Sequence, residues 1–91
     1  MANYTMDYNE ISRQYGQLTA QLDDLSRVLD NMTNIQETML GAAQWQTADK
    51  QEFADRFKAF LDAGRQLHRT GVSEAETLKK VGETYRAAEQ R

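Results

Sequence analysis

The chain has 91 residues, no cysteine, no proline and a formal net charge of −3. This length predicts one small domain, and the lack of cysteine excludes disulfides, thiolate metal sites and cysteine nucleophiles. The acidic balance argues against a nucleic-acid partner, and a mean hydropathy of −0.80 with 40% apolar residues predicts narrow apolar stripes on long helices.

The N-terminal residues are polar, with Asp7 and Glu10 among them. Signal peptides need an apolar central region, and membrane-spanning helices need about 20 consecutive apolar residues. No segment of the sequence has either property. We therefore expect no cleavable signal peptide and no membrane insertion.

The first periodic segment carries apolar residues in alternating steps of four and three, continued by Ile35 and Met39 after one short step. This heptad pattern is typical of a helix that packs against another helix. It predicts a first helix over residues 6–40, about 50 Å long. The row consists of Tyr4, Tyr8, Ile11, Tyr15, Leu18, Leu22, Leu25, Leu29 and Met32.

Residues 41–48 interrupt the periodicity and predict a turn. Gly41 suits the left-handed position that follows a helix, and Thr47 or Asp49 suits the N-cap of the next one. Asp49 and Glu52 resemble a capping box. A short connection makes the helices antiparallel, so the sequence predicts an all-α, antiparallel two-helix hairpin that forms a single domain over residues 1–91.

The second periodic segment predicts a helix over residues 49–89, although each of its glycines costs about 1 kcal/mol relative to alanine. Gly64 and Gly71 lie one heptad apart on the apolar row, so they either admit a close approach of the facing helix or mark a kink near 69–73, with Ser73 as a cap. Both interpretations fit equally well. The row is Phe53, Phe57, Phe60, Gly64, Leu67, Gly71, Glu74, Leu78, Val81, Tyr85 and Ala88, widened on one side by Leu61, Ala75 and Gly82.

Two helices alone cannot enclose both rows, so we expect a four-helix bundle, formed as a homodimer or with a similar chain. Residues 1–40 hold six acids and two bases, whereas residues 41–91 hold eight acids and nine bases. This difference weakly favours packing of helix one of each chain against helix two of the other. The expected core or interface residues are Ile11, Tyr15, Leu18, Leu22, Leu25, Leu29, Met32, Phe53, Phe57, Phe60, Leu67, Leu78 and Val81.

The sequence offers little for catalysis or metal binding. His68 is the only histidine and lacks the spacing of a metal site or catalytic triad, so we expect an exposed helix residue. Acids and bases near the start of the second helix alternate at surface-pair spacing, and phosphate-binding or nucleophile motifs are absent. We expect no enzymatic activity, no cofactor and no metal site.

Trp45 lies in the turn, Phe53 and Phe57 follow it, and Tyr85 and Glu89 form Tyr-x-x-x-Glu at the end of the second helix. With the length and the two long helices, this pattern resembles the WXG family of type VII (ESX) secretion proteins, which includes the early secreted antigens of mycobacteria. The resemblance covers nearly the whole chain and depends on the order and placement of short motifs. The family's turn reads Trp-x-Gly, and Thr47 stands in the place of its glycine, which leaves open a WXG-like partner of a larger type VII toxin.

The resemblance implies a protein made in the bacterial cytoplasm and secreted as a folded helical dimer, with the type VII secretion ATPase as a partner. In the family, the terminal Tyr-x-x-x-Asp/Glu is an export signal completed by the turn of the partner subunit. Tyr85 and Glu89 would carry this signal here, and Trp45 and Thr47 would form the turn motif.

Other interpretations stay open. From its spacing alone, Tyr85 is a core residue, and Trp45 closes the end of the core by packing over Phe53. Alternative functions are an accessory protein that binds the N-terminal helices of a larger toxin and completes its export signal, or an intracellular coiled-coil adaptor.

Overall fold

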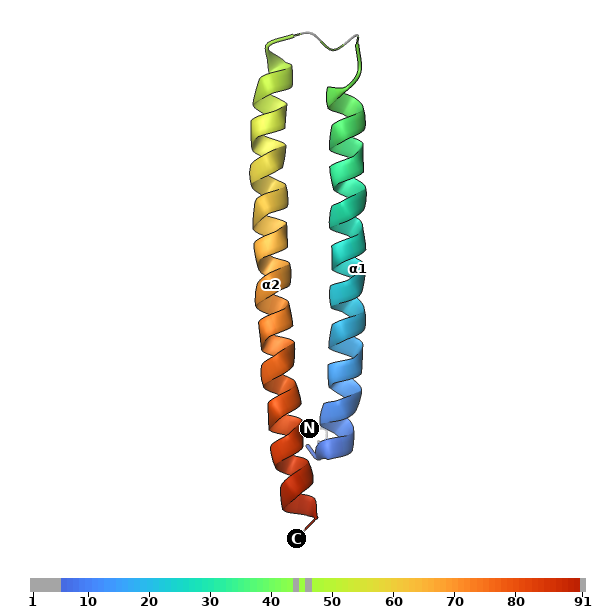
Figure 1. The fold of residues 1–91 in the computed structure, drawn as a ribbon, viewed down its shortest axis with the longest axis vertical. Coiled ribbons are helices and arrows are strands. Elements are labelled where there is room, and N and C mark those ends of the chain that lie inside the picture. The colour runs from blue at the N-terminus through green and yellow to red at the C-terminus, as the bar shows by residue number, and fades with distance from the viewer. Residues whose placement is uncertain (1–5, 44, 46, 91) are drawn as a thin grey trace, which may run out of the picture.

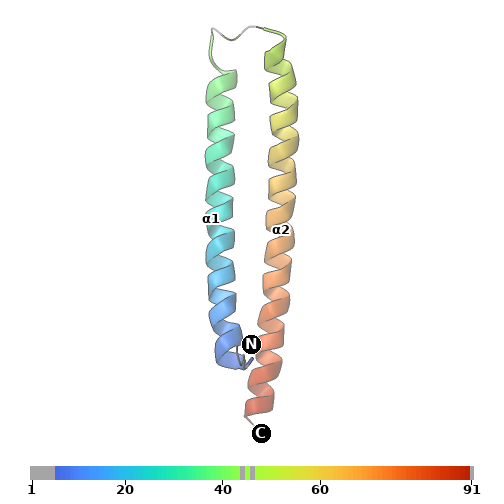
Figure 2. The same ribbon diagram turned by 180° about the vertical axis from the view of Figure 1, so that it is seen from behind.

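The computed structural model describes residues 6–43, 45 and 47–90. Two antiparallel helices, α1 (Tyr8–Leu40) and α2 (Asp49–Glu89), make up almost all of this part of the chain, and it contains no strand (Figure 1). The rod measures 68 × 22 × 22 Å. The view from behind shows the same single layer, with neither face covered by another element (Figure 2). The predicted all-α hairpin is confirmed.

The start of α1 is fixed by Asp7, which makes the helix begin two residues later than predicted. Asp7 has extended backbone (φ −128°, ψ 179°), and its carboxylate accepts the backbone N–H of Glu10 at 2.8 Å. This is a side-chain N-cap, which satisfies one of the unpaired amides at the helix start. The amide of Tyr8 donates to the Glu89 carboxylate at 3.0 Å, so the last residue of α2 contributes to the same helix end.

The end of α1 differs from the prediction for Gly41. This glycine has φ −81° and ψ −6°, within the right-handed region, and its N–H donates to the Glu37 carbonyl at 3.0 Å. No described residue has a positive φ. The left-handed cap was therefore a wrong prediction, because the chain leaves α1 by extending its right-handed turn.

The start of α2 also differs from the prediction. The N-cap is Ala48, which has helical backbone and makes no side-chain cap, so both Thr47 and Asp49 were wrong as caps. The Thr47 hydroxyl accepts the Trp45 indole N–H at 3.2 Å, and the Thr47 carbonyl accepts the Lys50 N–H at 3.1 Å. Because this turn begins before Asp49, Asp49 is already the first helical residue and the predicted capping box does not form.

Helix α2 is continuous through Gly71, so the kink interpretation is wrong and the close-approach interpretation is confirmed. A Cβ atom at Gly64 would lie 2.6 Å from Leu29 Cδ2, and one at Gly71 would lie 2.5 Å from Leu22 Cδ2. The leucines of α1 thus occupy the space that these glycines leave open. The contacts also fix the register of the two helices.

The core between the helices is narrow. Its buried apolar residues are Ile11, Leu29, Leu61 and Ala75, and Gly82 is buried beside Ile11. On α2 the row that faces α1 therefore passes through Leu61, Ala75 and Gly82, which the sequence placed only at the margin. Three of the residues predicted for the core or interface, Phe60, Leu67 and Val81, are exposed in the hairpin and are not part of its core. Their predicted role at an interface stays a prediction.

Candidate functional site

The two broad sides of the hairpin differ in chemistry. The contacts that Arg65 makes with α1 define the first side. Its guanidinium lies 3.0 Å from the Thr33 hydroxyl and 3.4 Å from the Asp30 carboxylate of α1. Arg65 follows the buried Leu61 by four residues, and Thr33 follows the buried Leu29 by four. In this antiparallel pair, residues four positions after a buried one therefore face the same side, which we call the polar face.

The opposite side of the hairpin carries a second set of residues. Each of them lies either three positions after or one position before a residue that faces the other helix. We call this side the apolar face. Its members Ile35, Phe60 and Leu67 are 55%, 53% and 63% exposed, which is high for large apolar side chains. The face consists of Leu18, Leu25, Val28, Met32, Ile35 and Met39 of α1 and Phe53, Phe57, Phe60, Leu67, Leu78, Val81 and Tyr85 of α2.

Aromatic rings form a continuous series at the turn end of the apolar face. The ring centroids of Trp45 and Phe53 lie 5.3 Å apart, those of Phe53 and Phe57 5.3 Å, and those of Phe57 and Phe60 5.7 Å. These separations are typical of favourable aromatic pairs. The predicted packing of Trp45 over Phe53 is confirmed, and the indole N–H is held by Thr47.

The terminal pair lies at the other end of the rod. Figure 1 shows the C-terminal end of α2 projecting past the start of α1. Tyr85 is 39% exposed, so it is not part of the core within the hairpin. Glu89 accepts the Tyr8 amide, and the Arg86 guanidinium lies 5.5 Å from the centre of the Tyr8 ring. Tyr85 and Glu89 lie about one turn apart at the end of α2, and the length of the hairpin separates them from Trp45 and Thr47.

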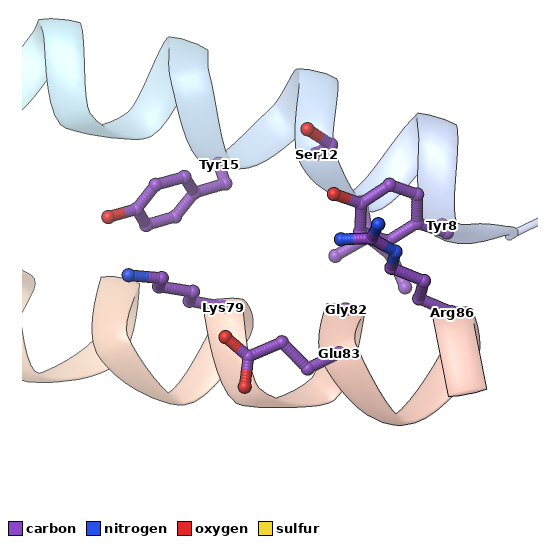
Figure 3. Close-up of a pocket in the computed structure, with 8 residues that line it drawn as sticks. Tyr8, Ser12, Tyr15, Lys79, Gly82, Glu83 and Arg86 are labelled. Atoms are coloured by element: carbon purple, nitrogen blue, oxygen red, sulfur yellow. The ribbon is translucent and has the colours of Figure 1, made fainter.

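A groove crosses the polar face near this end (Figure 3). It has a volume of about 300 Å³, and the small Gly82 lies in its wall, where a Cβ atom would come 3.0 Å from Ile11. The sequence did not predict this groove. Its one signal was Gly82, a glycine within a helix on the row facing α1. The lining residues are Tyr8, Ile11, Ser12, Tyr15, Lys79, Gly82, Glu83 and Arg86.

His68 is half-buried rather than exposed as predicted, because it lies seven residues from both Leu61 and Ala75 on the row that faces α1. It lines a shallow groove of about 120 Å³ with Asp23 and Glu76. Over residues 6–43, 45 and 47–90, no group of three His, Asp or Glu side chains could hold a metal ion. Neither α1 nor α2 contains a stretch apolar enough to cross a bilayer.

The chain matches no model of a protein family, and it has no significant similarity to a curated protein or to a solved structure.

Proposed function

We propose that this chain is a small type VII (ESX) secretion substrate or co-secretion partner that is exported folded, as a helical dimer. Tyr85 and Glu89 form the recognition element for the secretion machinery, and the rest of the apolar face, from the turn as far as Val81, pairs with another helical hairpin. The chain acts through binding, and its two ends and its apolar face are the surfaces it offers.

The observation that carries the proposal is the position of Tyr85. Its side chain is 39% exposed on the end of α2, away from the row that packs on α1. A core role within the hairpin therefore does not account for it. Glu89 lies one helical turn further along, so a receptor groove approaching this end meets an aromatic ring beside a carboxylate.

Glu89 has a second role that the experiment must separate from recognition. Its carboxylate accepts the Tyr8 amide at 3.0 Å and so supports the start of α1. This bond is exposed to water, and an exposed hydrogen bond of this kind contributes about 1 kcal/mol or less. Loss of export in a Glu89 variant that keeps its fold would thus report on recognition.

The test compares the amount of protein in the culture supernatant of the native host for the wild type and for Tyr85→Phe and Glu89→Gln variants. Each has a matched control, Tyr15→Phe and Glu83→Gln, which change the same chemical groups outside the terminal pair. We expect both test variants to accumulate in cells while both controls are exported. Unchanged export of the test variants, or a wild-type protein that never leaves the cell, would overturn the proposal.

A second candidate function is supported by the uncovered apolar face. Its large exposed side chains, such as Leu67 and Phe60, suit the N-terminal helices of a larger toxin as well as another small hairpin. In that case the chain would be an accessory protein that completes the toxin's export signal. Co-expression with neighbouring toxin genes followed by pull-down distinguishes the two, because a homodimer that ignores the toxin contradicts the accessory role.

A further inference from the structure

We propose that Tyr8 is a positioning residue for the terminal recognition element, because its main-chain amide holds Glu89 and its ring holds Arg86 against the start of α1. The secretion machinery then meets Glu89 in the orientation that Tyr8 sets, and the element is complete only when α1 lies along the end of α2. This inference rests on the proposed function and adds to it a residue from the other end of the chain.

The register of the hairpin places Tyr8 beside the terminal pair. Leu22 packs at Gly71, and moving from this contact by the same number of residues along each helix brings Tyr8 level with Tyr85. The N–H groups of an α-helix point toward its start. The amide of Tyr8 therefore points past the level of Tyr85, toward the last turn of α2, which contains Glu89.

The Tyr8 amide has no acceptor within its own helix. Tyr8 is the first residue of α1, and the first four N–H groups of a helix lack intrahelical partners. This amide donates to Glu89 Oε1 at 3.0 Å, and the positive end of the helix dipole adds to the attraction for the carboxylate. A carboxylate offers about four acceptor positions on its two oxygens, so Glu89 can still accept a hydrogen bond from a receptor.

The Tyr8 ring makes a second contact with the last turn of α2, through Arg86. The guanidinium lies 5.5 Å from the ring centre, within the range of a cation–π interaction. Figure 3 shows the Arg86 side chain lying against Tyr8 at one end of the groove. The ring also lies beside Gly82, where an added Cβ would be 4.0 Å from Tyr8 Cδ1. Tyr8 therefore orders the residue that follows Tyr85 in Tyr-x-x-x-Glu as well as the glutamate.

These contacts bear on recognition because Glu89 and Arg86 are long, exposed side chains. A receptor that binds a freely rotating side chain must immobilise it, which weakens binding, whereas a side chain held beforehand avoids much of this loss. Tyr85 belongs to the apolar face, whereas Tyr8 and Arg86 line the groove on the polar face. The contacts thus leave the Tyr85 ring open to the turn of a partner subunit.

Two substitutions of Tyr8 separate its amide from its ring. Tyr8→Ala removes the ring and keeps the N–H, whereas Tyr8→Pro removes both. Proline is favoured at the first position of a helix, and Asp7 has the extended backbone that suits a residue before proline, so Tyr8→Pro should fold. Tyr8→Phe keeps the ring and the amide, and Tyr15→Ala is a control that removes a ring from the same groove.

Hydrogen exchange tests the contact without any export step. We expect the amides in the last turn of α2 to exchange about twofold to tenfold faster in Tyr8→Pro than in Tyr8→Ala, which is the range for loss of one hydrogen bond. Tyr15→Ala should leave these amides within about twofold of the wild type. Equal exchange in Tyr8→Pro and Tyr8→Ala would overturn the proposal.

Export from the native host tests the effect on recognition. With the folded fraction of each variant measured, we expect Tyr8→Phe to be exported normally and Tyr8→Pro to be exported about twofold or more below Tyr8→Ala. A purely structural role of Tyr8 would not separate proline from alanine at equal folded fraction. Equal export of these two variants would therefore refute the positioning role.

The length of the Glu89 side chain gives a second test that leaves the start of α1 unchanged. Glu89→Asp keeps the charge and the Tyr-x-x-x-Asp/Glu pattern, but the side chain is one methylene shorter and draws the carboxylate away from the Tyr8 amide. We expect reduced export, and Tyr8→Pro/Glu89→Asp should be no worse than Tyr8→Pro because both changes remove the same bond. Glu83→Asp is the matched control and should be exported normally. Normal export of Glu89→Asp would contradict the proposal.

The outcomes also distinguish this inference from the proposed function. Glu89→Gln keeps a carbonyl oxygen that can accept the Tyr8 amide, so it tests the charge rather than the position of the side chain. If Tyr85→Phe and Glu89→Gln stay in the cell while Tyr8→Pro and Glu89→Asp are exported normally, the proposed function stands and the positioning role is wrong. If all four variants are exported normally, both are wrong.

Discussion

Replacement of Gly64 by alanine tests whether the close approach of the two helices sets the stability of the hairpin. In an open helical position, glycine to alanine stabilises by about 1 kcal/mol. At Gly64 the new Cβ would lie 2.6 Å from Leu29 Cδ2, and Leu29 is only 3% exposed, so its side chain has little room to move. Overpacking of this kind costs about 1–3 kcal/mol, which gives a net loss of about 0–2 kcal/mol for Gly64→Ala.

Gly16 supplies the matched control, because a Cβ atom there meets nothing within 4 Å and the residue is exposed on α1. Gly16→Ala should therefore stabilise by about 1 kcal/mol. The double variant Gly64→Ala/Leu29→Ala adds a second check. Leu29→Ala alone should cost about 2–5 kcal/mol, and the added methyl group should recover at least about 1 kcal/mol of that loss.

Urea unfolding followed by far-UV circular dichroism gives these differences, provided that all variants are compared at one protein concentration, since dimerisation contributes to the measured stability. If Gly64→Ala stabilises the protein as much as Gly16→Ala does, the packing argument is refuted. A purely additive double variant would refute the specific contact with Leu29.

Three smaller predictions follow from the helix ends and one surface pair. Asp7→Ala removes the side-chain N-cap of α1 and should lower the free energy of unfolding, measured in urea, by about 1 kcal/mol. Asparagine also caps helices, so an equal loss in Asp7→Asn would contradict the capping role. Thr47→Gly should not stabilise the turn, because no described residue there has a positive φ, and a rise in melting temperature would contradict this expectation. The same variant should change the fluorescence of Trp45, because it removes the hydroxyl that accepts the indole N–H. The hydrogen bond from Lys58 to Asp62, with their attraction, raises the pKa of Lys58, so its NMR titration should end at higher pH than in Asp62→Asn. A raised pKa means that any stability from this pair is present below the ordinary lysine pKa and is lost as pH rises through the higher value.

The sequence predicted the hairpin well because heptad spacing and the absence of proline act locally. The bounds of the second helix and the end of the first agree with the structure. The row on α2 was placed partly wrong because two overlapping rows, one residue apart, share Phe57, Gly64, Gly71 and Leu78. The row that faces α1 includes Ala75 and Gly82, whose small side chains give little apolar signal, whereas the exposed row includes Phe60 and Leu67.

The candidate site shows the same division. Packing of Trp45 over Phe53 followed from their spacing, since both lie near one helix start. The bond from the Tyr8 amide to Glu89 could not be predicted, because it joins residues 81 positions apart and depends on the register of the whole hairpin. The helix caps at Gly41 and Ala48 depend on a few backbone angles in the turn, which residue preferences alone do not determine.

The single connection between the helices also has a consequence for folding kinetics. Contacts near the turn close short loops, whereas each pair further along closes a longer one, up to the bond between Tyr8 and Glu89. We therefore expect the hairpin to assemble from the turn outward, with the chain ends joining last. The same gradient makes that end the first to open in the native protein, so hydrogen exchange should be faster at the amides around Tyr8 and Tyr85 than at helical amides in the half of the rod nearer the turn.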